Sequence, residues 1–410
     1  EVVRKAFKVA QTEKPGATHL DVPEDVAAET IENQAVQGPL QVQTPFRPEP
    51  LSTQVDRAVA VLAAAKRPVL FAGNGVIRNR AWEAVRRVAH RLTIPVVHTF
   101  MAKGVLPDRD PLSLYTLGLK TRDYAATVVE QADVVVAVGY DFVEYAPCFW
   151  NPHRDKAIVH LDVSPAEVDA HYIVKVGVLG DPGLALDQIG ERLQPFGQAW
   201  ARQCRETVVR GFEAEGEEPP VWPLRPQHVI GDLRAVLQDD DIVISDVGAH
   251  KLWMARMFPC AQPNTCIISN GFAAMGIALP GAIAAKLLHP DRRVLAVAGD
   301  GGFLMNSQEL ETAVRLNLPL VVLVWRDEGY GVIRWKQQLQ FGRTSNVDFG
   351  NPDLVRYAES FGARGYRVSG PGELKAVLVE ALACGRPAVV DCPVDYKENL
   401  RLTERLKKLG

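Results

Sequence analysis

The sequence lacks an excess of charge of either sign. Its 46 lysines and arginines against 49 aspartates and glutamates leave a formal net charge of −3 over 410 residues. So close a balance gives no electrostatic sign of a nucleic-acid or membrane-surface partner. The sequence also lacks an apolar run of the roughly 20 residues that would cross a bilayer as a helix. We therefore expect a soluble, cytoplasmic protein with no nucleic-acid or membrane partner.

Cysteine is scarce and unclustered. The six cysteines form no CxxC pair, and the nearest two, Cys260 and Cys266, have no His or Cys neighbours at zinc-ligand spacing. This pattern excludes a disulfide framework and a zinc ribbon. We expect buried free thiols in a reducing compartment.

The first residues lack an initiating Met, a basic leader and the apolar core of a signal peptide. Apolar residues recur at helical spacing from Val2 to Ala10, before a Pro-Gly stop at Pro15. A strand is expected next, at ATHLDVP (17–23). We interpret this region as the tail of a domain whose front is missing from the chain.

Two long blocks alternate helical patterns with short apolar strands, which is typical of parallel sheets covered by helices on both faces. The expected fold class is α/β, with two doubly wound parallel-sheet domains and the tail of a third. The expected segments are the remnant 1–36, a Pro-rich linker 37–54, a central Rossmann-like domain 55–192, a charged and poorly periodic linker 193–226, and a last domain 227–410.

Two acidic turns follow neighbouring strands of the last domain. The strand at 293–298 ends in Gly299-Asp300-Gly301-Gly302, and the strand at 320–325 ends in Arg326-Asp327-Glu328-Gly329. Glycines let the backbone approach a bound anion, and the helix that soon follows favours a phosphate. A carboxylate beside a phosphate indicates a divalent cation between them, since Mg²⁺ takes one or two carboxylates together with phosphate oxygens.

The strands are joined by one helix, so a right-handed crossover places the two turns close together. Asp300 alone is equally well explained as an ordinary Asp-Gly turn. The pair, 27 residues apart and each at a strand end, indicates a metal site.

GDGG, a helix, a buried strand and a second acidic turn together resemble the signature of thiamine diphosphate-dependent enzymes, whose second turn usually carries Asn-Asn. The resemblance implies that Asp300, Asp327 and the Gly329 carbonyl hold Mg²⁺, which bridges to the cofactor's diphosphate. It also implies phosphate contacts from Gly299, Gly301 and Gly302, and cofactor contact from Tyr330.

Two further stretches are similar to this family. SDVGAHKLWMARMF (245–258) resembles the first diphosphate-contacting loop, with Gly248, Ala249 and His250 at the anion. SNGFAAMGIALPGAIAA (269–285) resembles the segment that bends the cofactor. There the Ala273 carbonyl would accept from the 4′-amino group and Met275 would wedge beneath the cofactor; by spacing alone Met275 is an ordinary core methionine.

The three-part layout resembles the acetolactate synthase and pyruvate oxidase group, and stretches such as GYDFVEYAPCFWNPH (139–153) are similar to the catabolic acetolactate synthases. The resemblance spans nearly the whole chain. It implies condensation of two pyruvates to 2-acetolactate and CO₂ through a thiamine-bound enamine. It also implies a homodimer or homotetramer whose active site is shared between subunits.

The chain departs from this family in lacking the pyrimidine-binding domain that carries the catalytic glutamate. We expect the chain alone to be inactive, as a fragment or processed chain. LFAGNGVIRN (70–79) has G-x-G without the third glycine or the ribose-binding acid, and GYDFVEY has no Arg where FAD-dependent relatives show one, so FAD is not expected.

Several alternatives remain open. One is another thiamine diphosphate carboligase or decarboxylase, such as a glyoxylate or sulfoacetaldehyde enzyme. Others are a non-catalytic binding subunit and a flavin- or nicotinamide-dependent oxidoreductase. The roles of His98, Trp335 and Lys336 also stay open between cleft-lining and structural, whereas RLTERLKKL (401–409) is expected to be a solvated helix.

Overall fold

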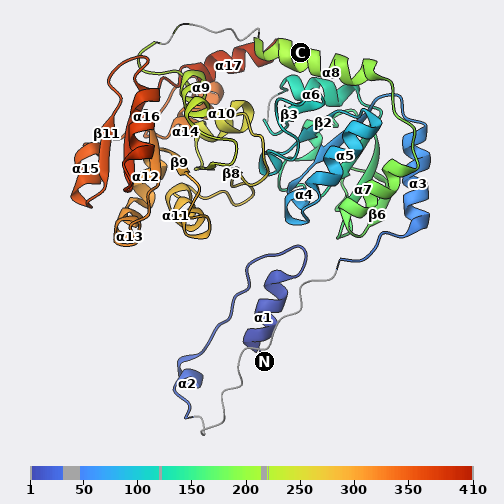
Figure 1. The fold of residues 1–410 in the computed structure, drawn as a ribbon, viewed down its shortest axis with the longest axis horizontal. Coiled ribbons are helices and arrows are strands. Elements are labelled where there is room, and N and C mark those ends of the chain that lie inside the picture. The colour runs from blue at the N-terminus through green and yellow to red at the C-terminus, as the bar shows by residue number, and fades with distance from the viewer. Residues whose placement is uncertain (1, 31–46, 120–121, 214–218, 220, 409–410) are drawn as a thin grey trace.

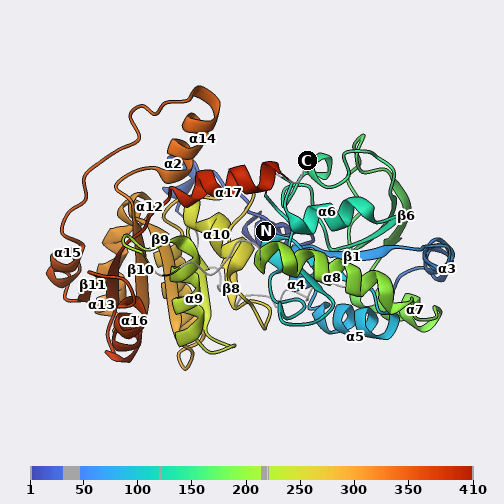
Figure 2. The ribbon, with the colours of Figure 1, turned by 90° about the horizontal axis from the view of Figure 1, so that it is seen from above.

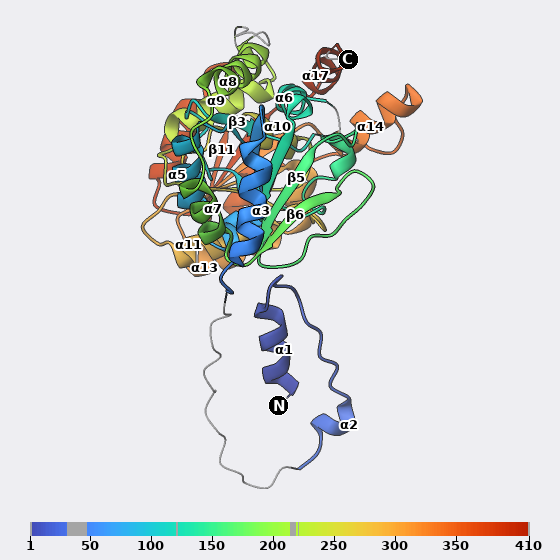
Figure 3. The ribbon, with the colours of Figure 1, turned by 90° about the vertical axis from the view of Figure 1, so that its right-hand side faces the viewer.

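The computed structural model describes residues 2–30, 47–119, 122–213, 219 and 221–408. Two six-stranded sheets form two domains that lie side by side, with α1 (Val2–Gln11) and α2 (Glu24–Ala27) outside both (Figures 1 and 3). Every strand pair in both sheets is parallel. The expected fold class is confirmed.

The central sheet has the strand order β3-β2-β1-β4-β5-β6. Its strands are β1 (Pro68–Ala72), β2 (Val96–His98), β3 (Ser113–Thr116), β4 (Val134–Val138), β5 (Ala157–Asp162) and β6 (Val174–Leu179). Its helices are α3 (Ser52–Ala63), α4 (Asn74–Arg78), α5 (Trp82–Leu92), α6 (Tyr124–Gln131), α7 (Pro182–Glu191) and α8 (Gln198–Glu213), with 3₁₀ turns at Phe100–Ala102 and Pro147–Phe149.

The C-terminal sheet has the order β11-β12-β10-β9-β7-β8. Its strands are β7 (Ile242–Ser245), β8 (Cys266–Ile268), β9 (Val294–Gly299), β10 (Val321–Arg326), β11 (Arg364–Arg367) and β12 (Ala388–Pro393). Its helices are α9 (Pro226–Val236), α10 (Ala249–Met257), α11 (Ala278–Leu288), α12 (Asp300–Met305), α13 (Leu310–Arg315), α14 (Gly331–Phe341), α15 (Leu354–Ser360), α16 (Leu374–Ala383) and α17 (Glu398–Lys407), with a 3₁₀ turn at Ser307–Glu309.

Both faces of each sheet are buried, which explains the unbroken apolar strands. In β1, Leu70 and Ala72 pack beneath α3, α5 and α7, while Val69 and Phe71 pack beneath α6 and α8. This is the period-two alternation of a strand, with an apolar layer on each side. The C-terminal sheet repeats it, with α9, α10, α16 and α17 on one face and α11, α13 and α15 on the other.

Three local expectations were wrong. Residues 17–23 form no strand: 17–22 are exposed coil, and Pro23 precedes α2. The segment 193–226 contains the 16-residue helix α8, which escaped notice because its buried stripe is only Ala201, Cys204 and Val208. The segment 37–54 lies mostly outside the described residues.

The third wrong expectation concerns the C-terminal helix α17, which was expected to be solvated but is partly buried. Leu402, Thr403 and Leu406 on α17 are buried, and Trp253 of α10 donates to Asn399 at 2.7 Å. Figure 2 shows α17 (red) lying over α10. The cysteines also differ in part from expectation: all six are free and four are buried, but Cys148 is exposed.

Candidate active site

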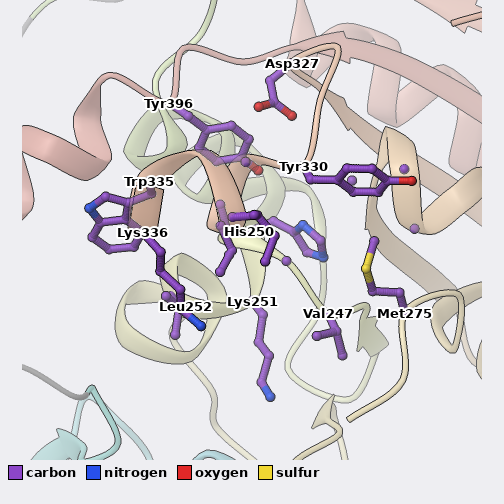
Figure 4. Close-up of a pocket in the computed structure, with 18 of the residues that line it drawn as sticks. Val247, His250, Lys251, Leu252, Met275, Asp327, Tyr330, Trp335, Lys336 and Tyr396 are labelled. Atoms are coloured by element: carbon purple, nitrogen blue, oxygen red, sulfur yellow. The ribbon is translucent and has the colours of Figure 1, made fainter. Parts of the chain in front are cut away.

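A cavity of about 520 Å³ opens at the carboxyl ends of β7, β9 and β10. Ligands of open α/β sheets bind at this edge, where the strand order reverses, and one such reversal lies between β7 and β9. The loops after all three strands line the cavity, and Figure 4 shows Val247 and Asp327 among its lining residues. Phe100 and Leu119 of the central domain also line it. Its size suits a cofactor-sized ligand.

Asp300 lies at the floor of this cavity as the first residue of α12, with Gly299 as the N-cap. The first helix after β9 therefore begins at the acidic turn itself. Asp300 is 1% exposed. Its Oδ1 accepts from Gly301 N at 2.8 Å, and its Oδ2 accepts from the backbone N–H groups of Asp327 and Glu328 at 3.2 and 2.7 Å.

These bonds join the two acidic turns directly. Burial raises the pKa of Asp327 to about 7, assisted by the charge of Asp300 and opposed by Arg334. Burial also raises the pKa of Asp300. Two buried carboxylates held side by side repel each other, and a divalent cation is the simplest group that relieves this repulsion.

Arg334 of α14 braces the second turn. Its Nη1 donates to Asp327 Oδ2 at 2.8 Å, and its Nη2 donates to the Glu328 carbonyl at 3.3 Å and to Asp348 Oδ1 at 2.5 Å. A Cβ on Gly329 would collide with this guanidinium. Glycine is therefore required at 329 for the brace to reach Asp327.

The turn after β7 brings Gly248, Ala249 and His250 to the cavity, with Gly248 as the N-cap of α10. A Cβ on Gly248 would lie 2.6 Å from His250 Cε1, so the ring occupies the space a side chain would need. Burial lowers the pKa of His250 to about 4, so the imidazole is neutral near pH 7. His250 Nε2 is buried and has no hydrogen-bond partner.

The loop with Met275 is anchored to β7 by Asp246. Asp246 Oδ1 accepts from Gly276 N at 2.9 Å, and Oδ2 accepts from Ala278 N at 3.4 Å. Gly276 has φ of +88°, where a Cβ would lie 2.7 Å from Asn306 Nδ2. Met275 therefore lines the cavity, whereas Ala273 is not among its lining residues.

The residues present fit a diphosphate with a divalent cation. The first N–H groups of α10 and α12 have no intrahelical acceptor, and both helices begin at the cavity. The unpartnered His250 Nε2 and the two carboxylates that repel each other are further groups that a bound diphosphate and cation would satisfy. No group of three or more His, Cys, Asp or Glu side chains suited to a metal occurs in the described parts of the chain. The two carboxylates, with the Gly329 carbonyl that the family resemblance adds, would suit a cation that keeps phosphate and water ligands.

Comparison with known proteins supports the same conclusion from sequence. Residues 55–189 match the model of the thiamine pyrophosphate enzyme central domain, and residues 246–392 match that of the C-terminal TPP binding domain. Over 415 residues the chain is 37% identical to an acetolactate synthase of Bacillus subtilis, covering 100% of this chain and 72% of that protein.

The chain belongs to the acetolactate synthase family of thiamine diphosphate-dependent enzymes. Other relatives include a probable acetolactate synthase large subunit of Methanococcus aeolicus, 31% identical over 100% of this chain and 72% of that protein. The catabolic acetolactate synthase of Raoultella terrigena is 30% identical over 99% of this chain and 73% of that protein.

Most residues singled out by the family's motifs meet at this one cavity. Its lining includes Gly248, Ala249, His250, Met275, Gly299, Asp300, Gly301, Gly302, Asp327, Gly329 and Tyr330. Trp335 and Lys336, whose roles were open, also line it, whereas His98 does not. His98 is buried at the end of β2, with Nε2 3.4 Å from Asp108 Oδ1.

Sequence reasoning missed four residues that shape the site: Asp246, Lys251, Arg334 and Asn351. Asn351 Nδ2 donates to Asp300 Oδ2 at 2.8 Å, although the two residues are 51 apart in the chain. An acid directly after strand β7, in ISDVG, was the one available signal for Asp246.

Proposed function

We propose that this protein condenses two molecules of pyruvate to 2-acetolactate with release of CO₂. The observation that carries the proposal is the pair of buried carboxylates, Asp300 and Asp327, joined at the floor of a cavity that Met275 also lines. The family membership narrows the chemistry to thiamine diphosphate-dependent reactions of 2-oxo acids. The relatives' names include acetolactate synthase in both a catabolic and an unqualified form.

The proposed cofactors are thiamine diphosphate and Mg²⁺. Asp300, Asp327 and the Gly329 carbonyl would hold the cation, and the N–H groups that begin α10 and α12 would hold the diphosphate. Bound thiamine diphosphate supplies the electron sink needed to decarboxylate a 2-oxo acid. FAD has no place in the proposal.

The chain's own residues would position the cofactor and exclude water. His250, neutral because burial lowers its pKa to about 4, offers an uncharged ring nitrogen beside the expected diphosphate. Met275 and Tyr330 give the cavity apolar walls, and Tyr330 packs on Phe349 with ring centroids 5.0 Å apart. Arg334 offsets the negative charge that Asp327 brings in place of the family's usual Asn.

The proposed partners are pyruvate as substrate and further copies of the chain, in a dimer or tetramer with shared active sites. In the described residues no helix is long and apolar enough to cross a membrane. We also propose a cytoplasmic location, which the six free thiols support because thiols stay reduced in the cytosol.

The test is product analysis with the protein, Mg²⁺, thiamine diphosphate and a panel of substrates that contains 2-oxo acids and sulfoacetaldehyde. We expect one acetolactate per two pyruvates consumed, with CO₂ released in equal amount to the acetolactate. Release of CO₂ without acetolactate, or faster turnover of glyoxylate or sulfoacetaldehyde than of pyruvate, would assign the chain to another reaction of this family.

A further inference from the structure

Lys251 is a buried cation in the cavity that lacks a counter-ion. It lies on the first turn of α10 and is 8% exposed. Its Nζ donates to Asn270 Oδ1 at 3.0 Å and lies 5.9 Å from the centre of the Phe100 ring. An ammonium group carries three donors, so one amide oxygen and one aromatic face leave it poorly satisfied.

The other buried lysines of the described chain are all better compensated. Lys103 lies 3.6 Å from Asp108 and also donates to the Ala255 carbonyl. Lys156 pairs with Asp155 at 2.9 Å. Lys286 donates to two backbone carbonyls, at 2.8 and 2.6 Å. Among the described residues, no carboxylate lies within ion-pair distance of Lys251.

An uncompensated buried charge is costly, and a bound anion removes that cost. The electrostatics of Lys251 agree with this. Burial lowers its pKa to about 8, and no neighbouring charge contributes to the shift. Because that value still lies above neutral pH, most of the side chain is a cation at pH 7, ready to bind an anion.

The position of Lys251 separates it from the metal site. In Figure 4 the side chain extends toward the central domain, at the opposite end of the view from Asp327. The cavity wall around it is apolar, with Phe100, Leu119, Val247 and Leu252. The cavity therefore has an acidic end suited to a cation and a cationic end suited to a small anion.

Asn270 fixes this cationic end to the central domain. Its Oδ1 accepts from Lys251, and its Nδ2 donates to the Glu144 carbonyl at 2.6 Å. The amide is thereby oriented with its oxygen toward the ammonium group. Lys251 is held at the junction of the two domains, with its remaining donors available to a ligand.

We propose that Lys251 is the substrate-binding residue that holds the carboxylate of the 2-oxo acid. The inference deepens the proposed function and rests on it for the identity of the acid. Pyruvate has one carboxylate beside its keto carbon, and a single ammonium in an apolar wall matches that charge. A neutral carbonyl compound of the same size gains nothing from this group.

The experiment measures the affinity of oxamate, which has pyruvate's carboxylate but no reactive ketone, by NMR titration without added cofactor. Ethyl oxamate, its neutral ester, is the matched ligand. We expect Lys251→Met and Lys251→Gln to weaken oxamate binding about 10- to 100-fold, the usual worth of a charged hydrogen bond. Lys251→Arg should restore most of it, and ethyl oxamate should bind all forms alike.

Lys336→Met is the control variant, since Lys336 lines the same cavity but is exposed. It should change oxamate affinity far less than Lys251→Met does. Removal of an unpaired buried charge should also leave the melting temperature of Lys251→Met equal to or above that of the parent. Equal oxamate affinity in the parent and both neutral variants would overturn the inference, as would equal binding of oxamate and its ester by the parent.

The result is separable from the proposed function. If the protein makes acetolactate but substitution of Lys251 leaves oxamate affinity unchanged, the inference about Lys251 fails and the proposed function stands. If Lys251 governs oxamate affinity but pyruvate yields no acetolactate, the proposed reaction fails and the anion site stands.

Discussion

Each sheet has a reversal of strand order beside its first strand, between β1 and β4 in the central sheet and between β7 and β9 in the C-terminal sheet, and the crevices at these two points differ in content. The C-terminal crevice, between β7 and β9, opens into the cavity with Asp300 at its floor. The central crevice lies between β1 and β4, and contacts within the protein itself fill it. A Cβ on Gly75 would lie 2.5 Å from Gly139 Cα, so the two loops touch through their backbones.

A carboxylate of the protein takes the anion position in the central crevice. Glu144 is 5% exposed and accepts from the Asn74 N–H at 2.9 Å, at the start of α4, and from the Asp141 N–H at 3.2 Å. The Thr99 hydroxyl donates to it as well. Burial raises the pKa of Glu144 to about 7.

The comparison teaches that this fold offers an anion-binding edge twice, and side chains decide whether a ligand or the protein fills it. Glycines have opposite effects in the two crevices. In the central domain Gly73, Gly75 and Gly139 bring backbones together and close the crevice. In the C-terminal domain Gly301 and Gly302 keep the first turn of α12 free of side chains and leave the cavity open.

The largest expected effect is at the open crevice. Asp300→Asn should weaken Mg²⁺-dependent binding of thiamine diphosphate at least about 100-fold, because it removes one of the two proposed metal carboxylates and replaces an acceptor with a donor beside backbone N–H groups. Calorimetric titration measures this. Asp348→Asn, which changes a largely exposed carboxylate nearby, should alter affinity little; an equal loss in both variants would show a general effect of charge.

A smaller effect is expected at the second acidic turn. Asp327→Ala should weaken Mg²⁺ affinity about 10-fold, while Asp327→Asn keeps an oxygen ligand and should stay within a few-fold of the parent. Mg²⁺ titrations in the presence of thiamine diphosphate compare the two. Unchanged affinity in Asp327→Ala would remove this residue from the metal site.

The smallest effect is expected at the closed crevice, and it concerns stability alone. A raised pKa for Glu144 means that the folded state holds the proton more tightly than the unfolded state. The stabilisation of the folded state that protonated Glu144 provides is fully present below about pH 4.5 and is lost as the pH rises through about 7. Glu144→Gln should remove this loss, so the variant should gain about 1–3 kcal/mol on the parent between pH 5 and pH 8.

Urea denaturation at the two pH values measures that gain, with the exposed Glu359→Gln as the control. Thiamine diphosphate affinity should not change in Glu144→Gln. A loss of cofactor affinity as large as that of Asp300→Asn would erase the distinction between the two crevices.

The sequence alone determined the fold class and the acidic turns, because both depend on local signals. Unbroken apolar strands require a sheet buried on both faces, and β9 and β10 are adjacent in the sheet as well as consecutive in the chain. The positions of Asp300 and Asp327 at the ends of these two strands therefore predicted that they lie close together in the folded protein. Local signals failed for α8, whose buried stripe is narrow, and for residues 17–23, which are exposed and form no strand.

Only the tertiary structure decided how the site is supported. Asn351 reaches Asp300 across 51 residues, and Asp246 holds the Gly276 turn across 30. No periodicity encodes such pairs, because hydrogen bonds between distant segments depend on where the folded chain brings them. The same holds for charge: Lys251 and Glu144 are ordinary polar residues in the sequence. Burial in the folded protein makes Lys251 a cation without a counter-ion and raises the pKa of Glu144 to about 7.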